Sequence, residues 1–362
     1  MAGIYVHIPY CHAKCAYCDF FSTPVLKSAK STAEGIIAEY RMRIQELDGH
    51  KIDTIYFGGG TPSSLPTELL QRITAALPMN VAIERTIEVN PEDVNADTSQ
   101  IWRELGFNRI SMGVQSLVDD ELAFVGRRHS ASDALNAIDI LRTVGFDNIS
   151  CDLIYGLPGQ TAESWKHSLH TLVDTGIEHL SAYSLSYEPG TRLFVMLEAG
   201  LITPVDDDIV AEMYHELCTK CTDAGLEHYE ISNFARPGMR SRHNSSYWNA
   251  TPYLGLGPGA HSYDKEGIRR SAPHNIAKWL QNGPEIEYEN HIEQLNDLII
   301  TGLRTSDGLD TNTLPLAEKE ALLRRARTYI NRGMVKYNGT SLSIPERHWL
   351  VSDGIMRDLM AE

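Results

Sequence analysis

The chain has 362 residues, of which 42% are hydrophobic and 22% charged, and its formal net charge is −16. This length exceeds one ordinary domain, and the composition allows a large core and excludes a mainly disordered chain. The acidic excess repels phosphate backbones and anionic lipids, so we expect neither nucleic acid nor a membrane surface as a partner.

The N-terminus carries no secretion signal, because MAGIYVHIPYCHAKC runs into a short apolar strand without a basic region or a long apolar stretch. No apolar run approaches the roughly 20 residues that a membrane span needs. Six cysteines are present, and in a large chain without a secretion signal we expect them to be reduced. The sequence therefore predicts a cytoplasmic protein.

Six short β-rich segments recur along the chain, each followed by a polar or glycine-rich loop and then a helical pattern. The predicted strands are residues 5–8, 54–57, 85–89, 109–113, 148–154 and 179–185. This alternation predicts βαβ units and a parallel sheet, and so an α/β fold. Six repeats favour a partial (β/α)6 TIM-like barrel, and an open doubly wound sheet is the alternative.

Unusual polar or glycine-rich loops follow all six predicted strands. They are the cysteine loop, GGGTP (58–62), NPED (90–93), GVQS (113–116), DLIYGLPGQT (152–161) and SLSYEPGT (184–191). In β/α barrels, the loops at the carboxyl ends of the strands build the active site. We therefore predict a functional site at this rim.

The remaining sequence predicts two further regions after the barrel. A glycine- and aromatic-rich stretch follows residue 232 and predicts no regular core element. Helical patterns then precede a hairpin pattern with Asn338-Gly339 at its turn, which is typical of a winged-helix-like module. We divide the chain into a core barrel, a connecting segment and a small helical, winged-helix-like C-terminal domain, at residues 1–232, 233–284 and 285–362.

Three cysteines, Cys11, Cys15 and Cys18, form a Cys-x3-Cys-x2-Cys motif in the loop after the first strand. Three thiolates can ligate three irons of a 4Fe-4S cluster and leave the fourth iron open. An open iron can chelate the amino and carboxylate groups of S-adenosylmethionine (SAM). Zinc with His7 or His12 as a fourth ligand is the alternative. No second Cys-x2-Cys pair lies nearby at finger-like spacing, which favours the cluster.

Further motifs give the chain a family resemblance. They are YVHIPYCHAKCAYCDF, FGGGTP, IEVNPED, ISMGVQS, DLIYGLPGQT, HNSSYW, LGLGPGAHSY and TGLRTSDGLD. The chain resembles the radical SAM superfamily, and within it the family of oxygen-independent coproporphyrinogen III oxidases and HemW-type heme chaperones. The resemblance runs from residue 4 to 263 and resumes at 301–310. It implies a radical SAM barrel with a 4Fe-4S cluster on the three cysteines.

The resemblance also implies a SAM site formed by residues at the predicted rim. A turn of three glycines lets the backbone approach the methionine amino group, where a Cβ would obstruct it. A guanidinium suits the carboxylate of the ligand because it binds in a bidentate manner. The implied contacts are Tyr5, Tyr17, Gly58, Gly59, Gly60, Thr61, Glu88, Gln115, Arg127, Asp152 and Ser186.

Two departures separate this chain from the oxidase branch that it resembles. Phe20 stands where the oxidases have a further cysteine, and only ten residues precede Cys11, where the oxidases carry a long extension. HNSSYW instead matches HNxxYW, a signature of HemW-type proteins that is associated in them with heme binding. The resemblance thus implies heme contacts from His243, Tyr247 and Trp248. His261, in GPGAHS, is a second candidate for contact with the cofactor or with heme.

The leading hypothesis is therefore a heme chaperone that binds heme and passes it to an acceptor protein, without coproporphyrinogen oxidase activity. The implied partners are heme, a heme-acceptor protein of respiratory type and a reducing electron donor, and a homodimer is compatible with the resemblance. The competing hypothesis is an oxygen-independent coproporphyrinogen III oxidase that decarboxylates propionate side chains by radical chemistry. A third is a radical reaction on an unrelated substrate.

Overall fold

The computed structural model describes residues 1–264, 266 and 268–361. Its strands are β1 (Ala2–Ile8), β2 (Ile52–Gly59), β3 (Glu84–Val89), β4 (Arg109–Gln115), β5 (Ile149–Tyr155), β6 (His179–Ser184), β7 (Glu227–Glu230), β8 (Asn233–Ala235), β9 (Tyr253–Leu256), β10 (His261–Tyr263), β11 (Ile268–Ser271), β12 (Glu285–Tyr288), β13 (Leu309–Asp310), β14 (Lys336–Tyr337) and β15 (Ser341–Ser343). Its α-helices are α1 (Ala29–Arg43), α2 (Thr67–Ala76), α3 (Ala96–Glu104), α4 (Asp119–Val125), α5 (Ala131–Val144), α6 (Ala162–Asp174), α7 (Arg192–Glu198), α8 (Asp207–Asp223), α9 (Arg242–Trp248), α10 (Ile276–Asn282), α11 (His291–Leu303), α12 (Leu316–Asn331) and α13 (Ser352–Leu359).

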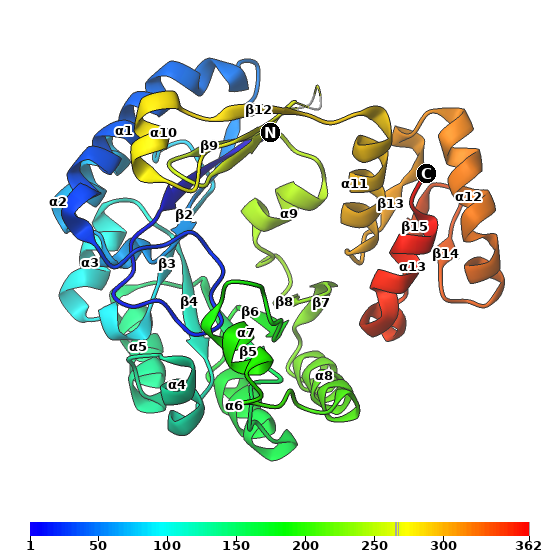
Figure 1. Ribbon diagram of the computed structural model, residues 1–362, viewed down its shortest axis with the longest axis horizontal. Coiled ribbons are helices and arrows are strands. Elements are labelled where there is room, and N and C mark those ends of the chain that lie inside the picture. The colour runs from blue at the N-terminus through cyan, green and yellow to red at the C-terminus, as the bar shows by residue number, and fades with distance from the viewer. Residues whose placement is uncertain (265, 267, 362) are drawn as a thin grey trace.

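A curved twelve-stranded sheet forms the body of the molecule, in the order β12-β11-β10-β9-β1-β2-β3-β4-β5-β6-β8-β7. Strands β1 to β6 are parallel to one another, and helices cover the convex face of the sheet (Figure 1). All six predicted strands occur in the predicted order. The α/β fold with a partial six-stranded TIM-like barrel is therefore confirmed.

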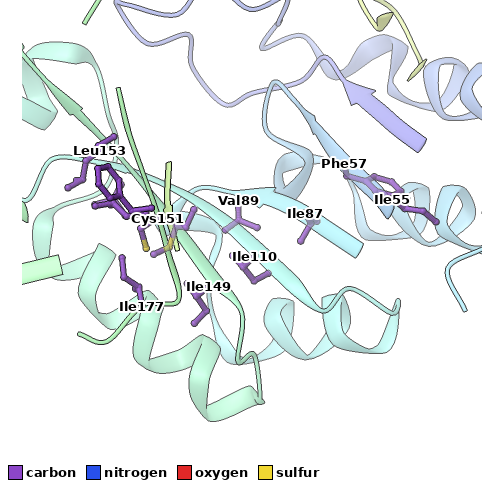
Figure 2. Packing of buried hydrophobic residues seen from close by; sticks show 14 of the residues in the cluster. Ile55, Phe57, Ile87, Val89, Ile110, Ile149, Cys151, Leu153 and Ile177 are labelled. Atoms are coloured by element: carbon purple, nitrogen blue, oxygen red, sulfur yellow. The ribbon is translucent and has the colours of Figure 1, made fainter. Parts of the chain in front are cut away.

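The convex face of the sheet is apolar, and this face makes the main core. Phe57 lies beside Ile87 across β2 and β3, and Ile110 lies beside Ile149 across β4 and β5. These side chains are fully buried beneath the helices, as Figure 2 shows. Burying each one stabilises the fold by about 1.5–3 kcal/mol relative to exposure.

The concave face of the same strands is polar, because alternate residues of a strand point to opposite faces. Glu88 lies beside Ser111 in the register of β3 and β4, and Asp152 lies beside Ser181 across β5 and β6. The interior of an ordinary TIM barrel is filled mainly by branched aliphatic side chains. A polar interior therefore indicates a binding site.

The glycine- and aromatic-rich stretch from residue 233 to about residue 263 contains regular strands, so the prediction that it forms no regular core element is wrong. Strand β9 pairs in parallel with β1, while β10, β11 and β12 continue the sheet in antiparallel order. The main sheet therefore extends to Tyr288, beyond the predicted boundary. These strands have only three or four residues each, so they show no alternation of their own, and pairing with the edge of the barrel fixes them.

The C-terminal region forms a small separate sheet, β13-β15-β14, with helices α11, α12 and α13 around it (Figure 1). Strands β14 and β15 form a hairpin, and Gly339 in its turn has a positive φ of 100°. The Arg304 side chain at the end of α11 lies 3.1 Å from the carboxylate of Glu230 in β7 and joins this module to the barrel. Within the described residues, every helix is too short or too polar to cross a membrane.

Candidate functional site

A cavity of about 460 Å³ lies at the carboxyl ends of the barrel strands. Residues from the cysteine loop and from β2 to β6, with the loops that follow them, form its wall. They include Cys11, Cys15, Tyr17, Cys18, Tyr56, Gly59, Gly60, Thr61, Glu88, Asn90, Ser111, Gly113, Gln115, Arg127, Asp152, Ser181, Tyr183 and Ser186. We call this space the rim cavity. It brings nearly all predicted cluster and SAM residues together.

The cysteine loop is closed at its base and presents all three predicted ligands to the rim cavity. The backbone of Thr23 donates to Pro9 and accepts from Cys11, at 2.7 and 3.2 Å, so the loop returns to its starting point. Cys11, Cys15 and Cys18 are free thiols, and each is partly exposed. The donor set thus has three sulfurs facing one cavity, as a cluster with one open iron requires.

The surroundings of the cysteines suit an iron-sulfur cluster held by thiolates. Burial raises the pKa of the Cys18 thiol to about 11, so a thiolate at that position needs positive charge beside it. The guanidinium of Arg127 lies 3.5 Å from the sulfur of Cys15. These residues fit a 4Fe-4S cluster in both donor type and charge.

The glycine turn after β2 is tied to the start of the cysteine loop. Gly60 donates to the carbonyl of Ile8 at 2.8 Å, and Thr61 donates to Tyr10 at 2.6 Å. A Cβ at residue 60 would lie 2.5 Å from the carbonyl oxygen of Tyr10, a backbone atom that cannot swing aside. Gly59 has a positive φ of 107°, which favours glycine. The turn therefore needs glycine for its close approach to the cysteine loop.

Glu88 lies buried beneath the glycine turn. Its carboxylate accepts a hydrogen bond from the hydroxyl of Tyr56 at 2.8 Å and one from the backbone of Gly59 at 3.1 Å. Burial raises the pKa of Glu88 to about 7, and burial also raises the pKa of nearby Asp152 to about 6. Two carboxyl groups in one cavity thus titrate near neutral pH and favour a ligand with a positive charge.

Arg127 lies on the opposite wall, between the cysteines and β4. Its guanidinium donates to the side chain of Asn90 at 2.7 Å and to the carbonyl of Gly113 at 2.5 Å. Gln115 ends β4 with a positive φ of 70°, a conformation uncommon for a residue with a side chain. Such conformations persist only where surrounding contacts impose them, and they cluster at binding sites. Because Glu88 and Arg127 lie on opposite walls, the rim cavity has an acidic side at Glu88 and a basic side at Arg127.

Two predicted SAM contacts occupy other places. Tyr5 lines a second cavity, and its hydroxyl lies 3.1 Å from a ring nitrogen of His7. Gly58 lies behind the carboxylate of Glu88, where a Cβ would be 2.9 Å from a carboxylate oxygen. The SAM contact implied for Tyr5 stays a prediction: the ring of Tyr5 lies beside that of Tyr56, with centroids 6.1 Å apart, and in this structure the hydroxyl of Tyr56 is the one that donates to Glu88.

Sequence reasoning missed several residues of the rim cavity. Tyr56, Ser111, Ser181 and Tyr183 all line it, as does Asn90. The first four lie within strands at positions that alternate with buried apolar residues, so their polarity was a readable signal for an inward-facing site. Asn90 belongs to the NPED loop, which was singled out without assigning this residue.

The second cavity, of about 610 Å³, adjoins the rim cavity. Tyr247 and Trp248 lie on its wall, together with His261 and His274. Asp19 and Phe20 at the end of the cysteine loop line both cavities, and Phe20 is 64% exposed. The two spaces therefore meet at the end of the cysteine loop.

His243 occupies a different environment from the other residues of HNxxYW. Its imidazole is 1% exposed, with one ring nitrogen 2.8 Å from the hydroxyl of Thr54 and the other 2.9 Å from the hydroxyl of Tyr247. Burial lowers its pKa to about 3, so the ring is neutral. In this structure His243 orients Tyr247, whereas Tyr247 and Trp248 themselves reach the second cavity.

The barrel and the three-cysteine rim define a protein of the radical SAM class. The model of the Radical SAM superfamily matches residues 5–172. This class carries a 4Fe-4S cluster and SAM, which agrees with the chemistry of the rim cavity.

Relatives that align with most of the chain identify its family within this superfamily. The heme chaperone HemW of Bacillus subtilis (strain 168) is 38% identical over 273 residues, 73% of this chain and 71% of the relative. The heme chaperone HemW of Synechocystis is 35% identical over 92% of this chain and 86% of its own. The mouse radical S-adenosyl methionine domain-containing protein 1, mitochondrial, is 35% identical over 85% of this chain and 74% of its own length. The chain belongs to the HemW family of radical SAM proteins.

The fold is shared more widely than this family. Coproporphyrinogen III oxidase (HemN) from Escherichia coli superposes with a TM-score of 0.83 over 99% of this chain and 90% of its own, at 22% identity. At this identity the similarity establishes the common fold, which includes the additional strands and the C-terminal module.

Proposed function

We propose that this protein is a heme chaperone that binds heme and transfers it to an acceptor protein, using a 4Fe-4S cluster and an exchangeable SAM. The observation that carries the proposal is the meeting of two cavities at Asp19 and Phe20. One cavity has the sulfur, carboxylate and guanidinium groups suited to a cluster and SAM. The other has aromatic walls suited to a flat porphyrin.

In the rim cavity, Cys11, Cys15 and Cys18 would hold the cluster, which supplies an open iron for SAM and one-electron chemistry. Glu88 would attract the SAM ammonium at the glycine turn, and Arg127 would face its carboxylate. Tyr17 packs against Val125 and Ile154, so its ring would close the adenine side. The remaining predicted contacts, from Gln115, Asp152 and Ser186, lie on the same wall.

In the second cavity, Tyr247 and Trp248 would contact the heme face directly. His243 would act through Tyr247, because the hydrogen bond between them fixes the position of the tyrosine hydroxyl. The relatives named heme chaperones support this assignment over most of the chain length. The HNxxYW segment would thus form one wall of the heme site.

The alternative function is oxygen-independent coproporphyrinogen III oxidation, favoured by the fold shared with HemN. Phe20 argues against it, since this residue takes the place of the oxidases' further cysteine and lies between the two cavities. An exposed aromatic ring there offers a contact for a porphyrin and no thiol for chemistry. We therefore favour heme handling.

An anaerobic assay on the full chain with its reconstituted cluster separates the two functions. The protein is incubated with coproporphyrinogen III, SAM and dithionite, and a parallel sample is titrated with heme. We expect unchanged coproporphyrinogen and a Soret band that saturates at one heme per chain. Formation of protoporphyrinogen at catalytic turnover, or the lack of a saturable Soret band, would overturn the proposal.

The cluster assignment has its own test in a cysteine substitution. Cys15→Ala should abolish the iron-sulfur absorption and bound iron after reconstitution, because one of three ligands is lost. Cys218→Ala, a half-buried thiol on α8, is the matched control and should retain both. A full cluster on the Cys15→Ala protein would refute the ligand set.

Transfer requires partners beyond heme. We propose a heme-acceptor protein of respiratory type and a reducing electron donor for the cluster. We also propose that the protein acts in the cytoplasm, where free cysteines stay reduced.

A homodimer is part of the same hypothesis. Sedimentation of the heme-loaded and heme-free protein tests it, and an unchanged monomer in both would exclude it.

A further inference from the structure

We propose that heme iron in the second cavity takes its protein ligand from the pair His261 and His274, and that His243 is no iron ligand. This inference rests on the proposed function, because it specifies where and how the heme would bind. It follows from the hydrogen bonds and exposure of each histidine around the cavity.

His243 is poorly placed to bind iron. Both ring nitrogens lie within hydrogen-bond distance of hydroxyl groups, those of Thr54 and Tyr247. The ring is also enclosed by aromatic neighbours, with Tyr56 stacked at 5.1 Å and Tyr5 at 6.3 Å between ring centroids. Ligation of iron would require breaking a buried hydrogen bond and opening the barrel interior beside β1 and β2.

His7 also lines the second cavity, but both of its ring nitrogens have hydrogen-bond partners, as those of His243 do. One of its ring nitrogens lies 3.1 Å from the hydroxyl of Tyr5, and the other lies 3.0 Å from the carbonyl of Phe21. A carbonyl only accepts, so that nitrogen carries the hydrogen. The side chain is buried, and its role is to hold the end of the cysteine loop against β1.

His261 differs from His243 and His7, because its side chain is exposed on the wall of the second cavity. It begins β10, pairs with Ser271 of β11 through the backbone, and lies on the cavity wall with an exposed side chain. Within the described part of the chain, its ring forms no hydrogen bond. A neutral imidazole whose nitrogen has no hydrogen-bond partner and faces an open cavity is available to coordinate heme iron.

His274 is held in place on the same cavity by packing. Its ring stacks on Phe21, with centroids 5.6 Å apart and an interplanar angle of 16°. Both rings lie over Gly259, where a Cβ would be 3.3 Å from His274 and 3.4 Å from Phe21. Among the residues that the structure describes, nothing forms a hydrogen bond with this imidazole, so stacking orients the ring and leaves its nitrogens available.

The size and the aromatic lining of the cavity suit a porphyrin, and the charged residues Arg269, Glu289 and Asp297 on its wall pair with one another. Its volume of about 610 Å³ lies within the range of about 300–1,000 Å³ usual for ligand sites. Phe20, Tyr247 and Trp248 add flat apolar surface to its wall, and Tyr253 stacks edge-on against Tyr247 at 4.7 Å. Two free imidazoles in an aromatic cavity of this size form a heme site.

The test titrates ferric heme into the cluster-loaded full chain and follows the Soret band and the electron paramagnetic resonance spectrum. We compare the wild type with His261→Ala/His274→Ala, with His243→Ala, and with His167→Ala as an exposed histidine on α6. The double variant should bind heme at least tenfold more weakly and lose the histidine-ligated spectrum. Added imidazole should restore that spectrum, which a collapsed cavity would not allow.

His243→Ala should keep the histidine-ligated spectrum while its heme affinity falls, because Tyr247 loses its partner, whereas His167→Ala should keep both the spectrum and the affinity. Cluster absorption should report that every variant is folded. Wild-type spectrum and affinity in the double variant would overturn the inference while leaving heme binding intact. Loss of histidine ligation in His243→Ala, with cluster and fold retained, would overturn it as well. A wild type that binds no heme would instead refute the proposed function itself.

Discussion

At the scale of single residues, Glu88 shows how burial prepares a binding group. Among the described residues, its carboxyl has only the Tyr56 hydroxyl and the Gly59 amide as hydrogen-bond donors, and desolvation outweighs both, so its pKa is raised to about 7. An exposed glutamate titrates near pH 4.3. At neutral pH the folded protein thus holds this group poised between its two protonation states.

We predict that SAM affinity depends on pH through Glu88. Below about pH 7 the carboxyl is protonated and must lose a proton to pair with an ammonium, so affinity should fall as the pH drops and level off above pH 7. Asp152, with a pKa of about 6, contributes at the lower end. Calorimetric titration of the cluster-loaded protein measures the profile.

The matched variant for this profile is Glu88→Gln, which keeps the shape of the side chain and removes the ionisation. Its SAM affinity should be weaker and should change less with pH than that of the wild type, because Asp152, with a pKa of about 6, is then the group that titrates. A variant profile that slopes as steeply as the wild type would show that Glu88 does not meet the ligand's positive charge.

His243 gives a prediction about stability. His243→Ala removes a buried ring and leaves the hydroxyls of Thr54 and Tyr247 without their partner, so we expect a loss of about 3 kcal/mol in the free energy of unfolding. Urea unfolding measures it, with His167→Ala as an exposed control of near-zero effect. A change below about 0.5 kcal/mol would contradict the buried role.

At the scale of elements, the glycine turn and the cysteine loop act as one unit. We predict that Gly60→Ala disrupts SAM binding by at least tenfold, because the added Cβ would meet the Tyr10 carbonyl at 2.5 Å and push the turn from the loop. Gly354→Ala, a helical site with no heavy atom within 4 Å of the new Cβ, is the control. SAM titration compares them, and equal affinities would show that the turn adapts.

The barrel strands were predictable because two signals coincide in them. Residues such as Ile110 and Ile149 are apolar on one face, while Ser111 and Asp152 alternate with their neighbours on the other. The strands β9 to β12 were not predictable, since three- or four-residue strands carry no periodicity and form only when β1 offers an edge. Short elements of this kind depend on tertiary pairing.

The site was predictable where a motif fixes the local backbone, as with the cysteine loop and Gly59-Gly60-Thr61. It was less predictable where the fold decides which way a side chain turns. Tyr5 and Tyr56 lie side by side in register on β1 and β2, yet one faces the second cavity and the other faces the rim cavity. Sequence pattern gives the face of a strand, and the curvature of the sheet decides which cavity that face lines.

At the scale of the whole molecule, Arg304 connects three regions. It closes α11 of the C-terminal module, pairs with the buried Glu230 of β7, and lies over the ring of Trp248 at 5.3 Å. The backbone carbonyl of Arg304 also accepts from Ile231 at 3.2 Å. The module is therefore joined directly to the segment that we assign to heme.

We predict that Arg304→Ala destabilises the protein by about 3 kcal/mol, because it leaves the carboxylate of Glu230, 1% exposed, without its charge partner. Chemical unfolding measures the loss. Arg324→Ala, whose pair with Glu320 is exposed and 3.9 Å long, should cost less than about 0.5 kcal/mol. Equal effects of the two substitutions would argue against a structural joint at Arg304.

The central claim is that this molecule carries intact heme beside a SAM-binding cluster and gives it up to another protein. Its most direct test mixes the heme-loaded, cluster-loaded protein with apomyoglobin under anaerobic conditions, and follows the Soret band with and without SAM and dithionite. We predict transfer of unmodified heme, at a rate that changes several-fold with SAM and reductant in the wild type and is unaffected by them in Cys15→Ala. Heme that stays bound or is chemically altered, or a rate equally indifferent to SAM in both proteins, would contradict the account.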